Sequence, residues 1–150
     1  MKGYMKIIIY TTALLLLFVT DGSARQEQRY FLVKSTGIVK DTTTGLEWMA
    51  GPDKDTTWNG ARSWVRNLKT DGGGWRMPTL DELKGLYKKG AGPLNMTPLL
   101  KTTGWQVWSD KLKDSSFAWG FYYVGGGKGW DGRTFPYNFR AFAVRSKANK

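Results

Sequence analysis

Alternating apolar and polar residues predict the first element along the chain. The stretch GIVKDTTTGLEWM (37–49) predicts a β-hairpin, because short apolar runs at 38–40 and 46–49 flank the turn residues 41–45. Gly45 suits the end of this turn, since glycine adopts a positive φ without steric strain. The chain is therefore expected to form an antiparallel strand pair here.

A second pattern, with a period near 3.6 residues, predicts a helix within residues 55–74. Thr57 is placed to cap its first turn, and the glycines after Asp71 end it. The apolar positions expected to be buried are Trp58, Ala61, Trp64, Val65 and Leu68.

The same period predicts a second helix within PTLDELKGLYKKG (78–90). Thr79 and Glu82 have the spacing of a capping box, in which each side chain accepts a hydrogen bond from a backbone N–H of the first turn. Gly90 ends the predicted helix, with Lys88 and Lys89 in its last turn, where the helix dipole favours cations. The expected buried positions are Leu80, Leu83, Leu86 and Tyr87.

The rest of the chain alternates short aromatic segments with turns. Strands are predicted in WQVWS (105–109), FAWGFYYV (117–124) and RAFAVRS (140–146), and the segment GGGKGWDG (125–132) is interpreted as a glycine-rich hairpin between strands. A hairpin, two helices and a meander predict one α+β domain with short antiparallel strands.

The N-terminal residues have the composition of a secretory signal peptide. Lys2 and Lys6 precede an apolar run at 7–19, and Gly22 and Ala24 fit a cleavage site. The run is shorter than the ~20 residues of a spanning helix, so cleavage is favoured over the alternative, an uncleaved anchor. The protein is then exported, to the periplasm or outside the cell, with no stable membrane span after cleavage.

This organisation sets the expected boundaries and charge. The prediction is a signal peptide at 1–24, a polar lead-in at 25–35, the domain at 36–146 and a tail at 147–150. Without the charges of residues 1–24, the 23 basic and 12 acidic residues fall to 21 and 11, a net charge of +10. Such a charge attracts anionic lipid headgroups, polyanionic glycans or DNA, or serves solubility alone.

Composition also excludes several kinds of catalytic and metal-binding site. The chain has no histidine and no cysteine, which excludes disulfides, thiol nucleophiles, the usual histidine base and ordinary zinc sites. The segment 125–132 is not a phosphate loop, because Gly129 follows Lys128 where magnesium binding needs Ser or Thr. We therefore expect no enzyme activity, no cofactor and no metal site.

Aromatic residues next to basic ones are the candidates for ligand binding. Ten aromatic residues fall between positions 117 and 142, and most are expected to fill the core. Those in loop-like or glycine-rich segments are suited to stacking on sugars or bases. The expected binding set is Trp105, Lys111, Lys113, Lys128, Trp130, Arg133, Tyr137 and Arg140.

The order of the motifs GIVKDTTTGLEWM, TWNGARSW, GGGWRMPTLDELKGL, VWS and a terminal AVR resembles the Lcl-type C-terminal domain family. Such domains end certain bacterial collagen-like adhesins and occur alone in many exported bacterial proteins of unknown function. The resemblance covers residues 36–146, and its most specific part is W-R-[LM]-P-T-x-x-E-L. The motif residues to which we assign a structural role are Asp41, Gly45, Trp48, Trp75, Arg76, Pro78, Thr79 and Glu82.

The resemblance implies a fold akin to C-type lectins and formylglycine-generating enzymes, and binding rather than catalysis. It implies sulfated glycans as a ligand class and a homo-oligomer, a trimer in the adhesin branch. The chain lacks a collagen-like Gly-X-Y tract, which weakens the case for a trimer. Val65 and Ala143 stand in regions where many members have cysteines. The paired cysteines of the formylglycine-generating enzymes are absent, so that activity is not carried over.

Arg76 lies between Trp75 and a helix-starting proline, and we expect it to stabilise the fold. The prediction is a largely buried guanidinium paired with Asp41 or Glu82, whose removal costs about 3–5 kcal/mol.

The expected function is a non-enzymatic, lectin-like module that binds an anionic, for example sulfated, glycan or another surface polyanion. The alternatives are a protein-binding subunit of a cell-surface complex and an enzyme of the cell envelope.

Overall fold

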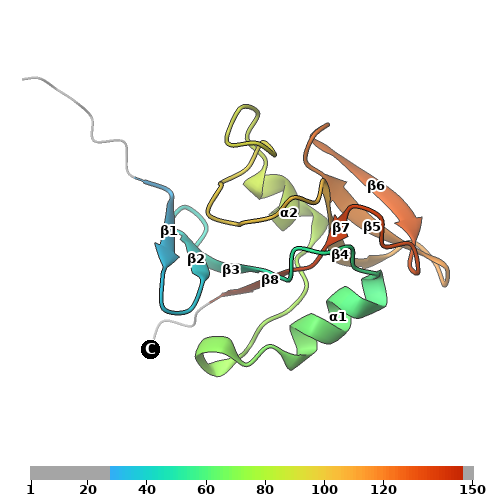
Figure 1. The fold of residues 1–150 in the computed structure, drawn as a ribbon, viewed down its shortest axis with the longest axis horizontal. Helices are drawn as coiled ribbons and strands as arrows, with labels where there is room; N and C mark the ends of the chain where they lie inside the picture. The colour runs from blue at the N-terminus through green and yellow to red at the C-terminus, as the bar shows by residue number, and fades with distance from the viewer. Residues whose placement is uncertain (1–27, 147–150) are drawn as a thin grey trace, which may run out of the picture.

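Two four-stranded sheets lie side by side in Figure 1, with one helix below them and the other between their upper parts. The computed structural model describes residues 28–146, so the predicted signal peptide at 1–24 and tail at 147–150 lie outside it. The helices are α1 (Trp58–Asn67), α2 (Leu80–Leu86) and a short 3-10 helix, η1 (Thr70–Gly72). The strands are β1 (Tyr30–Val33), β2 (Ile38–Asp41), β3 (Leu46–Ala50), β4 (Gln106–Leu112), β5 (Phe117–Tyr122), β6 (Gly127–Gly132), β7 (Phe139–Arg140) and β8 (Phe142–Ser146). The mixed α+β class is confirmed.

The first sheet has the strand order β1-β2-β3-β8, and all its neighbours are antiparallel. The β2–β3 pair confirms the predicted hairpin, with Gly45 at φ 71° in its turn. Within the expected lead-in, the run YFLV forms the edge strand β1, which pairs with β2 from Tyr30 opposite Asp41 to Val33 opposite Ile38. The sequence did not predict this pairing, because the four residues of β1 show no alternation of apolar and polar positions.

The second sheet has the order β6-β5-β4-β7, in which β7 runs parallel to β4. The register between β4 and β5 shifts between Trp108 and Leu112, which marks a β-bulge. The glycine-rich segment supplies the strand β6 itself, paired with β5 along its whole length. Strand β7 continues through Ala141 into β8, so one extended segment joins the two sheets.

Two apolar clusters fill the two sides of these sheets. Successive side chains on a strand point to opposite faces, so neighbouring residues join different clusters. The cluster at α1 includes Ile38, Trp108, Ala118 and Ala143, together with Trp58, Ala61 and Val65 of the helix. The cluster at α2 includes Val39, Val107, Phe121 and Val144, together with Leu83 and Leu86.

Both predicted helix starts are confirmed. The Thr57 hydroxyl accepts a hydrogen bond from the Gly60 N–H at 3.0 Å and caps α1. At α2 the Thr79 hydroxyl accepts from the Glu82 N–H, and the Glu82 carboxylate accepts from the Thr79 N–H at 2.8 Å, which completes the capping box.

Helix α2 ends earlier than its sequence pattern suggests. It stops at Leu86, because Tyr87 is extended and the Lys88 N–H donates to the Asn95 carbonyl in the following loop. Lys88 and Lys89 therefore follow the helix and are not in its last turn. The buried part of the predicted stripe is Leu83 and Leu86.

Arg76 forms the predicted pair with Glu82, at 2.8 Å and 2.5 Å through two nitrogens. The prediction that Arg76 is largely buried is wrong, because its side chain is 47% exposed. Asp41, the other expected partner, instead pairs with Arg29 at 2.6 Å. An exposed ion pair typically contributes ~0–1 kcal/mol, so the larger loss expected from the sequence does not apply. The pair instead holds the Glu82 carboxylate against the start of α2.

The arginine buried in the expected manner is Arg145, near the end of β8. Its Nη2 lies 2.7 Å from the Glu47 carboxylate and 2.5 Å from that of Asp71, and its Nη1 donates to the Gly73 carbonyl at 2.6 Å. Both Arg145 and Glu47 are buried. These contacts connect the first sheet to the loop that follows α1.

The capping box makes Thr79 a point where stability is measurable. We expect Thr79→Ala to lower the free energy of unfolding by about 1 kcal/mol, because a first-turn N–H loses its acceptor. Thr79→Ser keeps the hydroxyl and should lose much less. Urea unfolding of the three proteins measures this, and equal losses for both variants would contradict the cap.

Arg145→Met should lower the free energy of unfolding by about 3–5 kcal/mol, because it leaves the buried Glu47 carboxylate with only the longer contact of 3.7 Å to the Lys40 ammonium. Adding Glu47→Gln removes that stranded charge and should restore part of the loss. Denaturant unfolding of the single and double variants gives the comparison. A double variant no more stable than Arg145→Met would show that the pair is not the cause.

Candidate functional site

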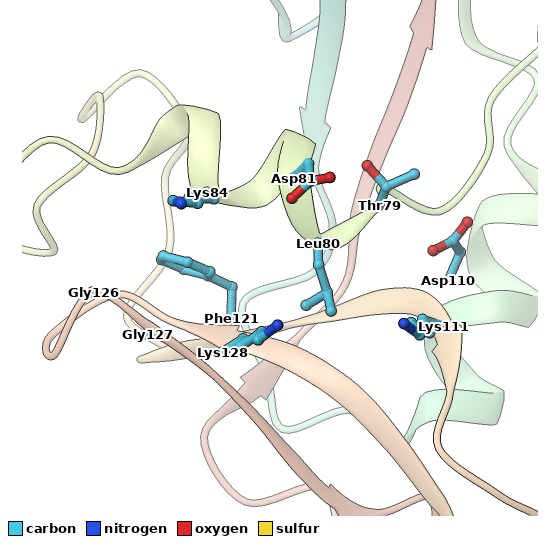
Figure 2. A pocket seen from close by; sticks show the side chains of 10 residues that line it. All are labelled: Thr79, Leu80, Asp81, Lys84, Asp110, Lys111, Phe121, Gly126, Gly127 and Lys128. Carbon is cyan, nitrogen blue, oxygen red and sulfur yellow. The ribbon is translucent and has the colours of Figure 1, made fainter.

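An open groove of about 700 Å³ lies between α2 and the second sheet (Figure 2). One wall is the start of α2, and the other is formed by β4, β5 and the turn into β6. Phe121 lies at its base, and Gly126 and Gly127 form an edge without side chains. The lining residues are Thr79, Leu80, Asp81, Lys84, Asp110, Lys111, Phe121, Gly126, Gly127 and Lys128.

Three lysines from three different elements line this groove: Lys84 from α2, Lys111 from β4 and Lys128 from β6. Figure 2 shows the ammonium ends of Lys111 and Lys128 pointing toward each other, with the Leu80 side chain between them. Within residues 28–146, none of the three forms an ion pair with a carboxylate. The groove thus presents unpaired positive charge to an incoming anion.

An aromatic surface continues from the groove along the second sheet. Lys128 is directly opposite Phe121, and Trp130 is directly opposite Trp119. Because directly paired residues share a face and every second residue returns to it, Phe117 lies on the same side as these four. We call Phe117, Trp119, Lys128 and Trp130, with Lys113, the basic aromatic face.

Lys113 is held on this face by ring contacts and by the Asp114 carboxylate, which lies 3.7 Å from its ammonium. Its ammonium lies 4.0 Å from the ring centroid of Trp130 and 5.4 Å from that of Phe117. The Phe117 and Trp130 rings meet edge to face, with centroids 5.1 Å apart. The Trp130 side of this arrangement is open, since that residue is 48% exposed. Such a ring beside an ammonium group can stack on a planar or pyranose ring while the cation meets an anionic substituent.

Two carboxylates, those of Asp81 and Asp110, balance part of the charge in the groove. Partial loss of water around the Asp110 carboxyl raises its pKa above the ordinary 3.8; the nearby Arg76 guanidinium opposes this rise, and the Glu82 carboxylate adds to it. Asp110 therefore takes up a proton more readily than a free aspartate does, and the groove becomes more positive as the pH falls.

The structure brings together four of the eight candidates from the sequence. Lys111 and Lys128 line the groove, and Lys113 and Trp130 lie on the basic aromatic face. The other four do not line the groove: Trp105, Arg133, Tyr137 and Arg140.

Arg140 was expected to bind a ligand, but its side chain is buried and paired within the fold. It is buried, and its guanidinium pairs with Asp53 at 2.7 Å and with Asp55 at 2.8 Å. A Cβ on Gly104 would overlap the Arg140 side chain, so the surrounding chain is packed closely on it. We assign Arg140 to the fold.

Sequence reasoning missed Lys84, Phe117 and Trp119. The alternation in FAWGFY places Phe117 and Trp119 on one face of a strand. The strand opposite them and the position of α2 over the groove depend on tertiary contacts, which no local pattern contains.

One known protein family matches this chain. A model of the Lcl C-terminal domain matches residues 37–145, which include every residue of the groove. The chain belongs to the Lcl C-terminal domain family. A search of curated proteins finds no match to it.

Two further findings concern residues 28–146 only. No helix in this range is long and apolar enough to cross a membrane. No group of three or more acidic side chains there is arranged to hold a metal ion.

Proposed function

We propose that this protein is an exported, non-enzymatic, lectin-like module that binds an anionic glycan in the groove and along the basic aromatic face. The observation that carries the proposal is the meeting of Lys84, Lys111 and Lys128 in one groove, with no carboxylate of residues 28–146 paired to any of them. The family and the mixed α+β fold support the finer assignment to a C-type-lectin-like fold. The signal-like N-terminal sequence supports export.

The two parts of the site suit the two parts of such a ligand. Sulfate or carboxylate groups are attracted by the lysines, and binding releases the counterions that surround a polyanion. The exposed ring of Trp130 offers an apolar surface for the face of a sugar ring. The groove is open, so a chain can pass through it without its ends having to enter.

A polymer also explains why the charges come from several elements. Lys84 and Lys111 lie on opposite sides of the groove, and Lys113 lies on the basic aromatic face beyond Lys111. Spacing of this kind matches an extended ligand with repeated charges better than a single small anion. The proposal therefore names a glycan chain as the ligand.

Removal of the groove lysines should weaken binding of a sulfated glycan such as heparin. We expect Lys111→Ala and Lys128→Ala each to reduce affinity about five-fold, the effect of about 1 kcal/mol for one basic contact. Lys34→Ala, which removes an exposed lysine outside this groove, is the control with the same change in charge. Titration calorimetry across a salt series measures the affinities.

The wild-type affinity should fall as salt rises, and the groove variants should show a shallower fall than the Lys34→Ala control. Equal losses for all three variants would mean that net charge alone attracts the glycan. Binding of neither sulfated nor uncharged glycans would remove the proposal and favour a protein partner.

Asp110→Asn should strengthen binding of the same glycan at neutral pH, because it removes a negative charge from the groove. Wild-type affinity should rise on acidification, since the raised pKa of Asp110 lets that carboxyl become neutral above the ordinary value of 3.8. The variant should show a smaller rise over the same pH range. An unchanged pH profile in Asp110→Asn would show that another group is responsible.

A further inference from the structure

The arginines of the described residues divide into two groups. Of the seven in residues 28–146, four form ion pairs with carboxylates: Arg29, Arg76, Arg140 and Arg145. The remaining three, Arg62, Arg66 and Arg133, form none, and all three lie at α1. Helix α1 and the groove lie on opposite sides of the second sheet, because α1 packs on one apolar cluster and α2, which borders the groove, packs on the other.

Helix α1 presents a cationic surface along its exposed side. Arg62 and Arg66 are four residues apart, so they project from the same side of the helix, and Lys69 follows them. The helix has no acidic residue along its length. Its surface charge is therefore positive without compensation from the helix itself.

Arg133 extends this surface at the start of α1. Its guanidinium donates to the Asn59 side chain at 2.8 Å and to the Ser115 carbonyl at 3.0 Å. The guanidinium carbons of Arg133 and Arg62 lie 4.7 Å and 5.6 Å from the ring of Trp58. Two arginines are thus held near the buried indole of Trp58. Because their side chains are already restrained, they lose less conformational entropy when they bind an anion.

An exposed aromatic pair follows Arg133 in the same loop. Phe135 is 47% exposed and Tyr137 is 60% exposed, and their ring centroids are 6.3 Å apart. The loop that carries them is fixed to the start of α1, because the Trp58 N–H donates to the Arg133 carbonyl at 3.0 Å. Pro136, between the two rings, lines an apolar hollow of about 420 Å³ together with Trp64 of α1.

We propose that α1 and the loop 133–137 form a second binding surface, which docks on an anionic phospholipid bilayer. Arg62, Arg66 and Arg133 would bind the phosphate groups of the lipid headgroups, to which the planar guanidinium is well suited. Phe135 and Tyr137 would enter the interfacial layer, where aromatic side chains are favoured.

The aromatic pair decides between a bilayer and a soluble polyanion. Phe135 has no polar group and projects from a loop, outside the groove and the basic aromatic face. A bilayer removes the ring from water while the adjacent arginines remain at headgroup level. This inference does not depend on the proposed glycan site, and together the two surfaces would hold a glycan and a membrane on opposite sides of one sheet.

Single cysteines locate the docking surface, because the native chain has none. In the full chain, Tyr137→Cys and, separately, Trp130→Cys are labelled with a polarity-sensitive fluorophore and mixed with vesicles. The vesicles contain phosphatidylcholine alone or phosphatidylcholine with phosphatidylglycerol. The label at position 137 should shift to shorter wavelength with anionic vesicles, and the label at position 130 should not.

Charge variants test the arginines by vesicle co-sedimentation. Arg62→Gln with Arg66→Gln should weaken binding to anionic vesicles about thirty-fold, whereas Lys111→Gln with Lys128→Gln removes equal charge and should have a much smaller effect. Residues 1–27 are the same in every variant, so a difference between the two pairs of substitutions does not come from them. Thermal melts confirm that the variants are folded.

Three results would overturn the inference. One is a label at position 137 that does not respond to anionic vesicles. Another is binding that is equal for both vesicle types or equally weakened by both pairs of substitutions. The third is loss of DNA binding in the Arg62→Gln, Arg66→Gln variant without any loss of vesicle binding, which would assign the surface to nucleic acid.

Discussion

The segment Phe139–Ser146 belongs to both sheets, and the architecture depends on how it is held. A buried arginine stabilises it near each end. Arg140 is bound by Asp53 and Asp55 from the loop before α1, and Arg145 by Glu47 of β3 and Asp71 of the loop after α1. A buried guanidinium is favourable only when carboxylates and carbonyls satisfy its donors. The two arginines therefore require both loops around α1 to be in place.

This constraint also fixes the position of the groove. Strand β7 pairs with β4, and β4 carries Lys111 into the groove, so the segment that joins the sheets also orients one groove wall. The opposite wall is the start of α2, which the capping box and the Arg76–Glu82 pair define. The bulge in β4 lies between Trp108 and Leu112, which is the part of the strand next to the groove. A helix and two strands thus carry the three groove lysines.

The arginines and lysines considered above fall into two groups, according to whether they pair with a carboxylate. Arginines that stabilise the fold are paired with carboxylates, as in Arg29–Asp41 and Arg140–Asp53. The groove lysines and the arginines at α1 have no such partner in the described part of the chain. Net charge alone cannot distinguish these groups, because both count equally toward it. The unpaired group is the one available to a ligand, and it is found on both sides of the second sheet.

The sequence by itself determined the features that depend on near neighbours. The β2–β3 hairpin, the Thr57 cap and the Thr79–Glu82 capping box each involve residues a few positions apart, so their spacing is sufficient to predict them. The motif order likewise identified the family. The tertiary structure alone decided which arginines are buried, since Glu47 and Arg145 are 98 positions apart. It also decided that Lys84, Lys111 and Lys128 share one groove, because strand pairing and helix packing bring together charges that no local pattern connects.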